Sequence, residues 1–167
     1  MRQGITAWRA TGAELGWPYC LAMLAKAYGK VGKTEEGLTA LAEAVATARK
    51  NGDRFWEAEL YRIKGELLLK IEDRRSKIER RDPQSSILDP LSLSSPEECF
   101  HKAIDIARQQ SAKSLELRAV MSLSCLWQKQ GKKEEARQML AEIYGWFTEG
   151  FATADLKEAK ALLDELS

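Results

Sequence analysis

The residue types best suited to phosphate chemistry lie in one short loop. Residues 29–34 read Gly-Lys-Val-Gly-Lys-Thr, and a phosphate-binding loop uses backbone N–H groups and a lysine of this kind to hold phosphates. That motif also needs a glycine where Ala27 stands and a strand before the loop, whereas a helical pattern precedes it here. A Gly-Lys-Lys turn recurs at residues 131–133. We therefore expect residues 29–34 to be a turn between helices.

Metal and nucleophile chemistry have equally little support. His101 is the single histidine, and it follows Cys99 by two residues, which places the two side chains on different faces of a helix. They supply neither a zinc ligand set nor a Cys–His nucleophile pair, so we expect His101 at the surface. Adjacent glutamates at 35–36, 97–98 and 134–135 each fall in the first turn of an expected helix, where the dipole favours negative charge. The sequence predicts no catalytic residue, cofactor or metal.

Composition excludes some partners and favours others. Charged residues make up 31% of the 167-residue chain and nearly balance at net +1, which is not the footprint of a nucleic-acid binder or a membrane-surface protein. Cys20, Cys99 and Cys125 are scattered, so we expect packing residues in a reducing compartment. The sequence has neither a run of about 18 apolar residues nor a signal peptide's apolar core. We expect a cytoplasmic protein whose partners are proteins.

The elements that would position any site are helices arranged as repeats. Residues 18–51 predict two antiparallel helices, because Leu21, Leu24, Ala25 and Tyr28 share one face of the first. Gly32 ends that pattern by tolerating a positive φ, and we expect the Thr34 hydroxyl to cap the second helix. Small residues on the second helix allow the backbones to approach closely, at Gly37, Ala44 and Ala48. The pair is an αα-hairpin that needs neighbours to bury its apolar face.

The same pattern recurs along the chain. Residues 117–150 repeat it at an offset of 99, and a middle copy begins at an offset of 40. The second helix of the middle copy is displaced by a 19-residue insertion. We expect one domain with these parts: an incomplete repeat at 1–12, repeats at 18–51, 58–110 and 117–150, a disordered insertion at about 74–94, and a capping helix at 153–166. Since the chain starts within a unit, we expect a fragment of a larger protein or a truncated frame, with an exposed face open to self-association.

Local signals mark several helix ends. Ser95 and Glu98 form a capping box, with Pro96 at the first helical position. The helix from about 55 to 71 has room to continue through Arg74 and Arg75 before Pro83 ends it. Further helices are expected at 96–110, 113–130, 133–147 and 154–166, with Gly52 closing one helix, Asp53 capping the next and Thr153 capping the last.

Leu-x-x-Ala-x-x-Tyr, followed by glycine and a small-residue helix, resembles the tetratricopeptide repeat. The resemblance implies an all-α fold, a right-handed superhelix of αα-hairpins closed by the C-terminal capping helix. The sequence departs from the family's pattern in two ways. The position that Tyr28 holds in the first repeat is filled by Leu68 in the second and by Trp127 in the third. The period also exceeds the family's usual length of about 34 residues.

Three strings support a narrower resemblance: QGITAWRATG at 3–12, EAELYRIKGELL at 57–68 and YGWFTEGF at 144–151. They are similar to the C-terminal repeats of bacterial proteins that join a class III adenylate or guanylate cyclase domain to a predicted ATPase. The resemblance implies a sensor or recruitment region in a signalling assembly. It implies no chemistry here, since the catalytic motifs of those proteins would lie upstream.

In the tetratricopeptide family the first helix of each pair lines a concave surface. The resemblance makes these residues candidate groove contacts: Tyr19, Lys26, Lys30, Arg62, Glu66, Gln128 and Lys129, with Ala22, Met121 and Cys125 among the other outward positions. Lys26, Lys30, Arg62 and Lys129 could grip a carboxylate or an acidic peptide, or they could be ordinary solvated charges. Trp146, Phe147 and Phe151 could form an interface or pack under the last helix.

Three functions stay open at this point. The first is a non-catalytic interaction domain of a larger bacterial signalling protein, and the second is a free-standing peptide-binding adaptor. The third is a small helical enzyme, which would need a polar cluster that the sequence does not show.

Overall fold

The described part of the chain is all-α. The computed structural model describes residues 16–52, 54–79 and 94–167, so the expectations for residues 1–12, Asp53 and Pro83 lie outside it. Those ranges contain helices and no strand. The helices are α2 (Trp17–Lys30), α3 (Thr34–Asn51), α4 (Glu57–Glu79), α5 (Pro96–Gln109), α6 (Lys113–Lys129), α7 (Lys133–Tyr144) and α8 (Ala154–Leu166).

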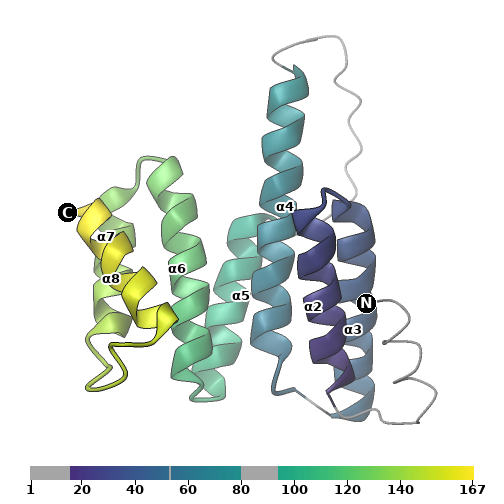
Figure 1. Ribbon diagram of the computed structural model, residues 1–167, viewed down its shortest axis with the longest axis horizontal. Helices are drawn as coiled ribbons and strands as arrows, with labels where there is room; N and C mark the ends of the chain where they lie inside the picture. Colours follow the sequence, from purple (N-terminus) through teal and green to yellow (C-terminus); the bar gives the residue numbers. More distant parts are fainter. Residues whose placement is uncertain (1–15, 53, 80–93) are drawn as a thin grey trace.

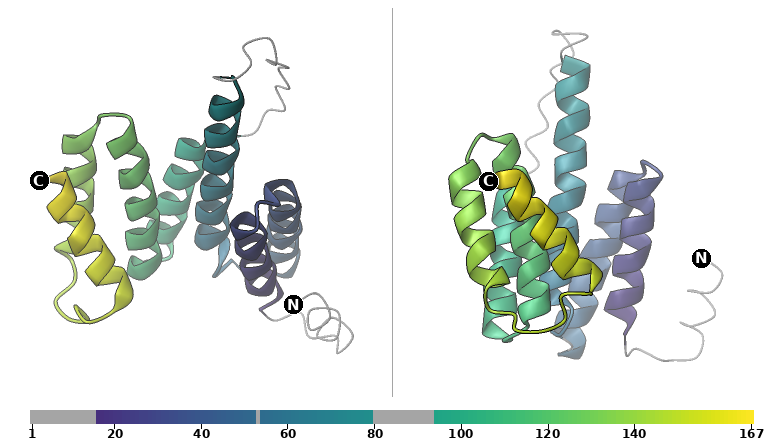
Figure 2. Two further views of the ribbon diagram at one scale, coloured as in Figure 1. Left: turned by 45° about the horizontal axis from the view of Figure 1, so that its top comes forward. Right: turned by 60° about the vertical axis from the view of Figure 1, so that its left-hand side comes forward.

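The helices stack in chain order as a solenoid. Each hairpin pairs two successive helices, α2 with α3, α4 with α5 and α6 with α7, and each hairpin packs on the next (Figure 1). The first helices of the hairpins also contact one another, α2 with α4 and α4 with α6, while α8 packs on both α6 and α7 (Figure 2). This pattern of neighbours defines an all-α helical repeat fold.

The core follows the predicted apolar faces. One cluster joins the first hairpin to α4 around Leu21, Leu41 and Ile63, and another joins α5 to α8 around Phe100 and Leu123. In the second hairpin, Gly65 on α4 lets α5 pack closely against it. A Cβ atom on Gly65 would lie 2.5 Å from the Phe100 ring, well inside van der Waals contact. The ring therefore occupies the space that a side chain at Gly65 would need.

The Gly-Lys-Val-Gly-Lys-Thr segment contains the turn between α2 and α3, as predicted. Gly32 has φ 82° and stands between α2 and α3, and Gly131 has φ 83° between α6 and α7. The predicted cap at Thr34 is wrong. Lys33 is the N-cap residue, while Thr34 is the first residue of α3, with a buried hydroxyl that has no hydrogen-bond partner in the described structure. Because Thr34 stands one residue past the N-cap, its hydroxyl is not at the position from which a side chain accepts the free N–H groups of the helix end.

Some of the other predicted helix ends are confirmed and some are wrong. Ser95 and Glu98 form both hydrogen bonds of the capping box, and Gly52 ends α3 in the left-handed region, so these predictions are confirmed. Thr153 stands at the N-cap of α8 but makes no capping bond, because its hydroxyl donates to the carbonyl of Gly150 instead. The helix predicted to reach residue 147 ends at Tyr144.

Helix α4 extends beyond residue 71, where the sequence pattern predicted that the helix could end. It continues to Glu79, so the first residues of the predicted disordered insertion are helical. The extension rests on the end of α2, where Lys70 Nζ lies 3.1 Å from the carbonyl oxygen of Gly29 and Arg74 Nη1 lies 2.8 Å from that of Gly32. Both bonds satisfy carbonyl groups that a helix C-terminus leaves without partners.

Candidate functional site

A groove of about 620 Å³ runs across the first helices of the hairpins and ends at α8. Its lining combines large apolar side chains with charged ones, and most of it comes from α2, α4, α6 and α8. The lining residues are Tyr19, Met23, Lys26, Trp56, Glu59, Arg62, Glu66, Leu69, Phe100, Arg118, Met121, Ser122, Cys125, Asp155 and Glu158.

Arg62 forms the floor of this groove. Its Nε and Nη2 atoms donate to the two carboxylate oxygens of Glu59 at 2.8 and 2.7 Å, and Nη1 donates to Glu66 at 2.5 Å and to Ser122 on α6 at 3.2 Å. Four of the five N–H donors of the guanidinium are thereby used. Burial of Arg62 disfavours its charge, but the two carboxylates outweigh that effect and raise its pKa above the ordinary value.

The wall of the groove near the C-terminus holds a second ion pair. Arg118 Nε on α6 donates to Asp155 Oδ2 on α8 at 2.8 Å, and both side chains are partly exposed. The sequence pattern predicted α8 as a capping helix and gave its polar face no role in the groove. That polar face, through Asp155 and Glu158, instead completes the groove. The spacing of the two acids by three residues on the polar stripe was the available signal.

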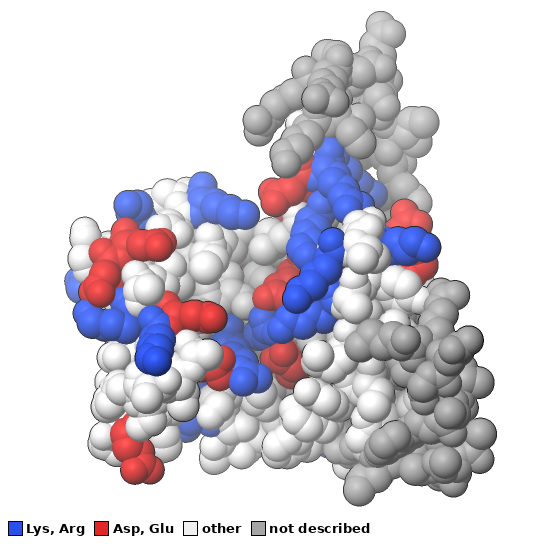
Figure 3. Space-filling model, in the orientation of Figure 1, with Lys and Arg blue, Asp and Glu red and all other residues white. Residues whose placement is uncertain are grey.

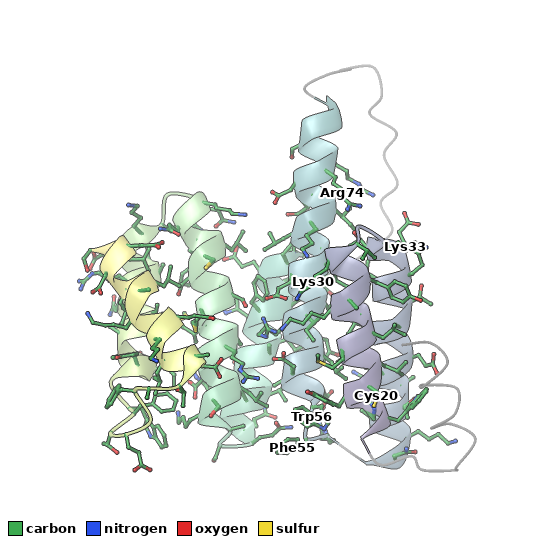
Figure 4. The ribbon with its side chains drawn as sticks, viewed as in Figure 1. Cys20, Lys30, Lys33, Phe55, Trp56 and Arg74 are labelled. Atoms are coloured by element: carbon green, nitrogen blue, oxygen red, sulfur yellow. The ribbon has the colours of Figure 1, made fainter. Side chains whose placement is uncertain are left out.

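The opposite end of the groove is aromatic. Tyr19 and Trp56 stack with ring centroids 4.5 Å apart, and Phe55 meets Trp56 edge-on at 4.8 Å. Tyr19, Met23 and Phe55 are all exposed at this end, and Figure 4 places Phe55 and Trp56 at the foot of α4. Phe55 and Trp56 lie in the connection before α4, which begins at Glu57 and not at about residue 55 as predicted. Sequence reasoning therefore missed both.

The predicted groove contacts are only partly brought together. Tyr19, Lys26, Arg62 and Glu66 line the groove, as do the outward positions Met121 and Cys125. Lys30 is exposed at the end of α2 beyond the lining, and Gln128 and Lys129 lie outside it, with Lys129 Nζ 3.8 Å from Asp73. Ala22 is buried, so Met23 takes the outward place that Ala22 was expected to hold. Cys125 is exposed, which contradicts its predicted role in packing.

The other candidates for chemistry lie apart from this groove. His101 is exposed as predicted, on a second groove of about 730 Å³ along α3, α4 and α5. Its charged neighbours there are engaged with one another, since Arg49 and Arg54 both reach Glu57. In the described ranges no group of three or more side chains is placed to hold a metal ion. None of the described helices combines the length and hydropathy of a membrane span.

At the C-terminal turn, Phe147 packs against the core while Trp146 and Phe151 are exposed. The aromatic cluster is thus divided between the two roles that the sequence left open for it.

Stacked hairpins with a groove on their first helices define a helical repeat domain. A family model described as anaphase-promoting complex subunit 5 matches residues 8–57 and 93–163, more than half of the chain. The chain belongs to this family, whose helical repeats are of the tetratricopeptide type. No curated protein and no solved structure matches the chain.

Proposed function

We propose that the chain is a non-catalytic protein–protein interaction domain that holds a segment of another protein in the groove. The observation that carries the proposal is the exposure of Tyr19 and Met23 beside Trp56 in a concave surface. Aromatic and methionine side chains are enriched at the cores of protein interfaces. The polar floor supports the same role, because Arg62 is already held by its own helix and needs no reorganisation when a partner binds.

The family adds support of a different kind. Its description is that of a subunit of a complex, and a subunit acts through contacts with other proteins. We propose that this chain has protein partners too, and that it works in the cytoplasm without cofactor or catalysis.

A second part of the proposal is that this domain belongs to a larger protein. The strings at 3–12, 57–68 and 144–151 support a C-terminal sensor or recruitment region of a larger bacterial signalling ATPase or cyclase protein. An immunoblot of cells from the source organism measures the size of the native polypeptide. A band several times heavier than 18.8 kDa supports this proposal. A band at that mass supports the free-standing adaptor instead.

Site-specific photocrosslinking tests the groove itself. Cys125 is exposed in the groove and accepts a maleimide crosslinker once Cys20 is replaced by serine. The matched control moves the only reactive thiol to Thr47, a partly exposed residue of α3 that is not part of the groove lining. We expect partners to be captured from Cys125 and not from position 47. The purified partner should then bind the wild-type chain and Thr47→Arg equally, and Met121→Arg at least tenfold more weakly. Equal binding to Met121→Arg would rule out the groove.

A further inference from the structure

The exposed face of α2 changes character along its length. Tyr19, Met23, Lys26 and Lys30 follow one another at intervals of four, three and four residues, so they form one stripe on the helix. Tyr19 and Met23 of this stripe lie at the aromatic end of the groove, and the stripe ends with Lys26 and Lys30. Eleven residues of helix separate Tyr19 from Lys30, a distance of about 16 Å.

Helix α4 adds two cations at the lysine end of this stripe. The hydrogen bonds from Lys70 to Gly29 and from Arg74 to Gly32 bring both side chains to the C-terminal end of α2, whose last residue is Lys30. Figure 3 shows Lys and Arg side chains as a band over α2 and α4, and Figure 4 shows Lys30 and Arg74 within it. Lys26, Lys30, Lys70 and Arg74 are called the basic band below.

The basic band is not neutralised from within the described structure. None of its four cations forms an ion pair in the described ranges. The nearest groove acid along α4 is Glu66, which is bonded to Arg62, and Asp73 faces Lys129. Lys26 lines the groove and the other three cations lie just beyond its lining, so binding of an anionic group there relieves repulsion between like charges as well as forming new pairs.

We infer that the groove takes an amphipathic protein segment with one apolar end and one acidic end. The apolar side chains contact Tyr19, Met23 and Trp56, and the carboxylates contact the basic band about 16 Å away. This inference rests on the proposed function and adds to it the chemistry and the orientation of the partner.

A nucleic acid fits the same surface less well. The groove lining carries four carboxylates, Glu59, Glu66, Asp155 and Glu158, which repel a strand that bears a phosphate at every residue. Trp56 is half-buried and packs against Tyr19 and Phe55, so less of its ring is open for base stacking. A protein segment with its acids confined to one end avoids both obstacles.

Selection of random 16-residue peptides displayed on phage against the immobilised chain tests this inference. We expect enriched peptides to carry an aromatic or aliphatic residue near one end and two or more acids near the other. The leading peptide is then synthesised with a fluorescent label, and its affinity is measured by anisotropy at two salt concentrations. The variant is Lys26→Glu with Lys30→Glu. The matched control is Lys50→Glu, a lysine in the last turn of α3 that is absent from the groove lining.

We expect the double variant to lose at least about fourfold in affinity, since each of its two exposed pairs contributes roughly two- to five-fold. Lys50→Glu should bind like the wild-type chain, and circular dichroism checks that all variants stay helical. Enriched peptides without acids, or equal affinity for the double variant, would overturn this inference. The proposed function, in which the groove binds a protein segment, would still stand. Tight binding of a twenty-nucleotide oligothymidine at the same surface would overturn it in favour of a nucleic acid. Peptides that bind Met121→Arg as well as the wild-type chain would instead overturn the proposed function.

Discussion

Arg62 on α4 donates a hydrogen bond to Ser122 on α6, with 3.2 Å between Nη1 and Oγ. The two residues are far apart in sequence and belong to successive hairpins, so this bond ties neighbouring repeats together at the floor of the groove. Because Glu59 and Glu66 accept three further hydrogen bonds from Arg62, the guanidinium is oriented from within its own helix. The groove therefore has a polar floor held in place between its aromatic end and the wall that carries the Arg118–Asp155 pair.

Replacing Arg62 by methionine should destabilise the fold strongly. The substitution leaves the buried Glu59 carboxylate without its partner, and breaking a buried ion pair in this way costs about 3 to 5 kcal/mol. Urea unfolding followed by circular dichroism measures the change. Arg118→Met is the matched control, since its pair with Asp155 is partly exposed and should contribute about 1 kcal/mol or less. Similar losses in the two variants would contradict the role of Arg62. The same reasoning makes Arg62 unsuitable for testing ligand binding.

Gly65→Ala should be destabilising by about 1 to 3 kcal/mol, because the new methyl group overlaps the Phe100 ring. The thermal midpoints of Gly65→Ala, Phe100→Leu and the double variant form a cycle that isolates the contact. We expect the double variant to be more stable than the sum of the two single changes predicts, since leucine is smaller than the ring. Strict additivity would show that the two positions do not compete for space.

The two helix caps provide a matched pair of alanine substitutions. Ser95→Ala removes the hydroxyl that accepts the backbone N–H of Glu98, and should lower the unfolding free energy by about 0.5 to 2 kcal/mol. Thr153→Ala removes a hydroxyl at the equivalent place of α8 that makes no capping bond, so its loss should be smaller. Chemical denaturation compares them directly. A larger effect at Thr153 would mean that its bond to Gly150 stabilises the turn more than the capping box stabilises α5.

Stability should fall in acid partly through Glu116. Burial opposes the charge of this carboxylate, but hydrogen bonds from Arg108 and Lys113 outweigh burial and lower its pKa below 4.5. A pKa lowered by folding stabilises the native state above the unfolded pKa, and this contribution is lost as the pH falls through the folded value. Glu116→Gln should therefore flatten the decline in unfolding free energy below about pH 4.5 while lowering stability at pH 7. An unchanged acid limb would exclude Glu116 as a contributor.

The helices and their hairpin turns could be predicted from local patterns. A capping box such as Ser95 with Glu98 acts within four residues, and Gly32 satisfies a turn through its own backbone freedom. Thr34 and Thr153 show where such reasoning fails. Each has the residue type of a cap, but the first stands one residue past the N-cap and the second bonds to a different carbonyl.

The sequence by itself determined that this protein is a helical repeat domain, because the apolar period of each helix and the recurrence of the hairpin are properties of the chain alone. Tertiary structure decided the groove. One residue of helix is a rotation of about 100°, so the packing of α2 on α3 and α4 decides whether Ala22 or Met23 faces the groove. Arg62 lies at the floor of the groove, and Asp155 lies in its wall beside Arg118. Both positions depend on contacts between helices that are distant in sequence, so no local pattern predicts them.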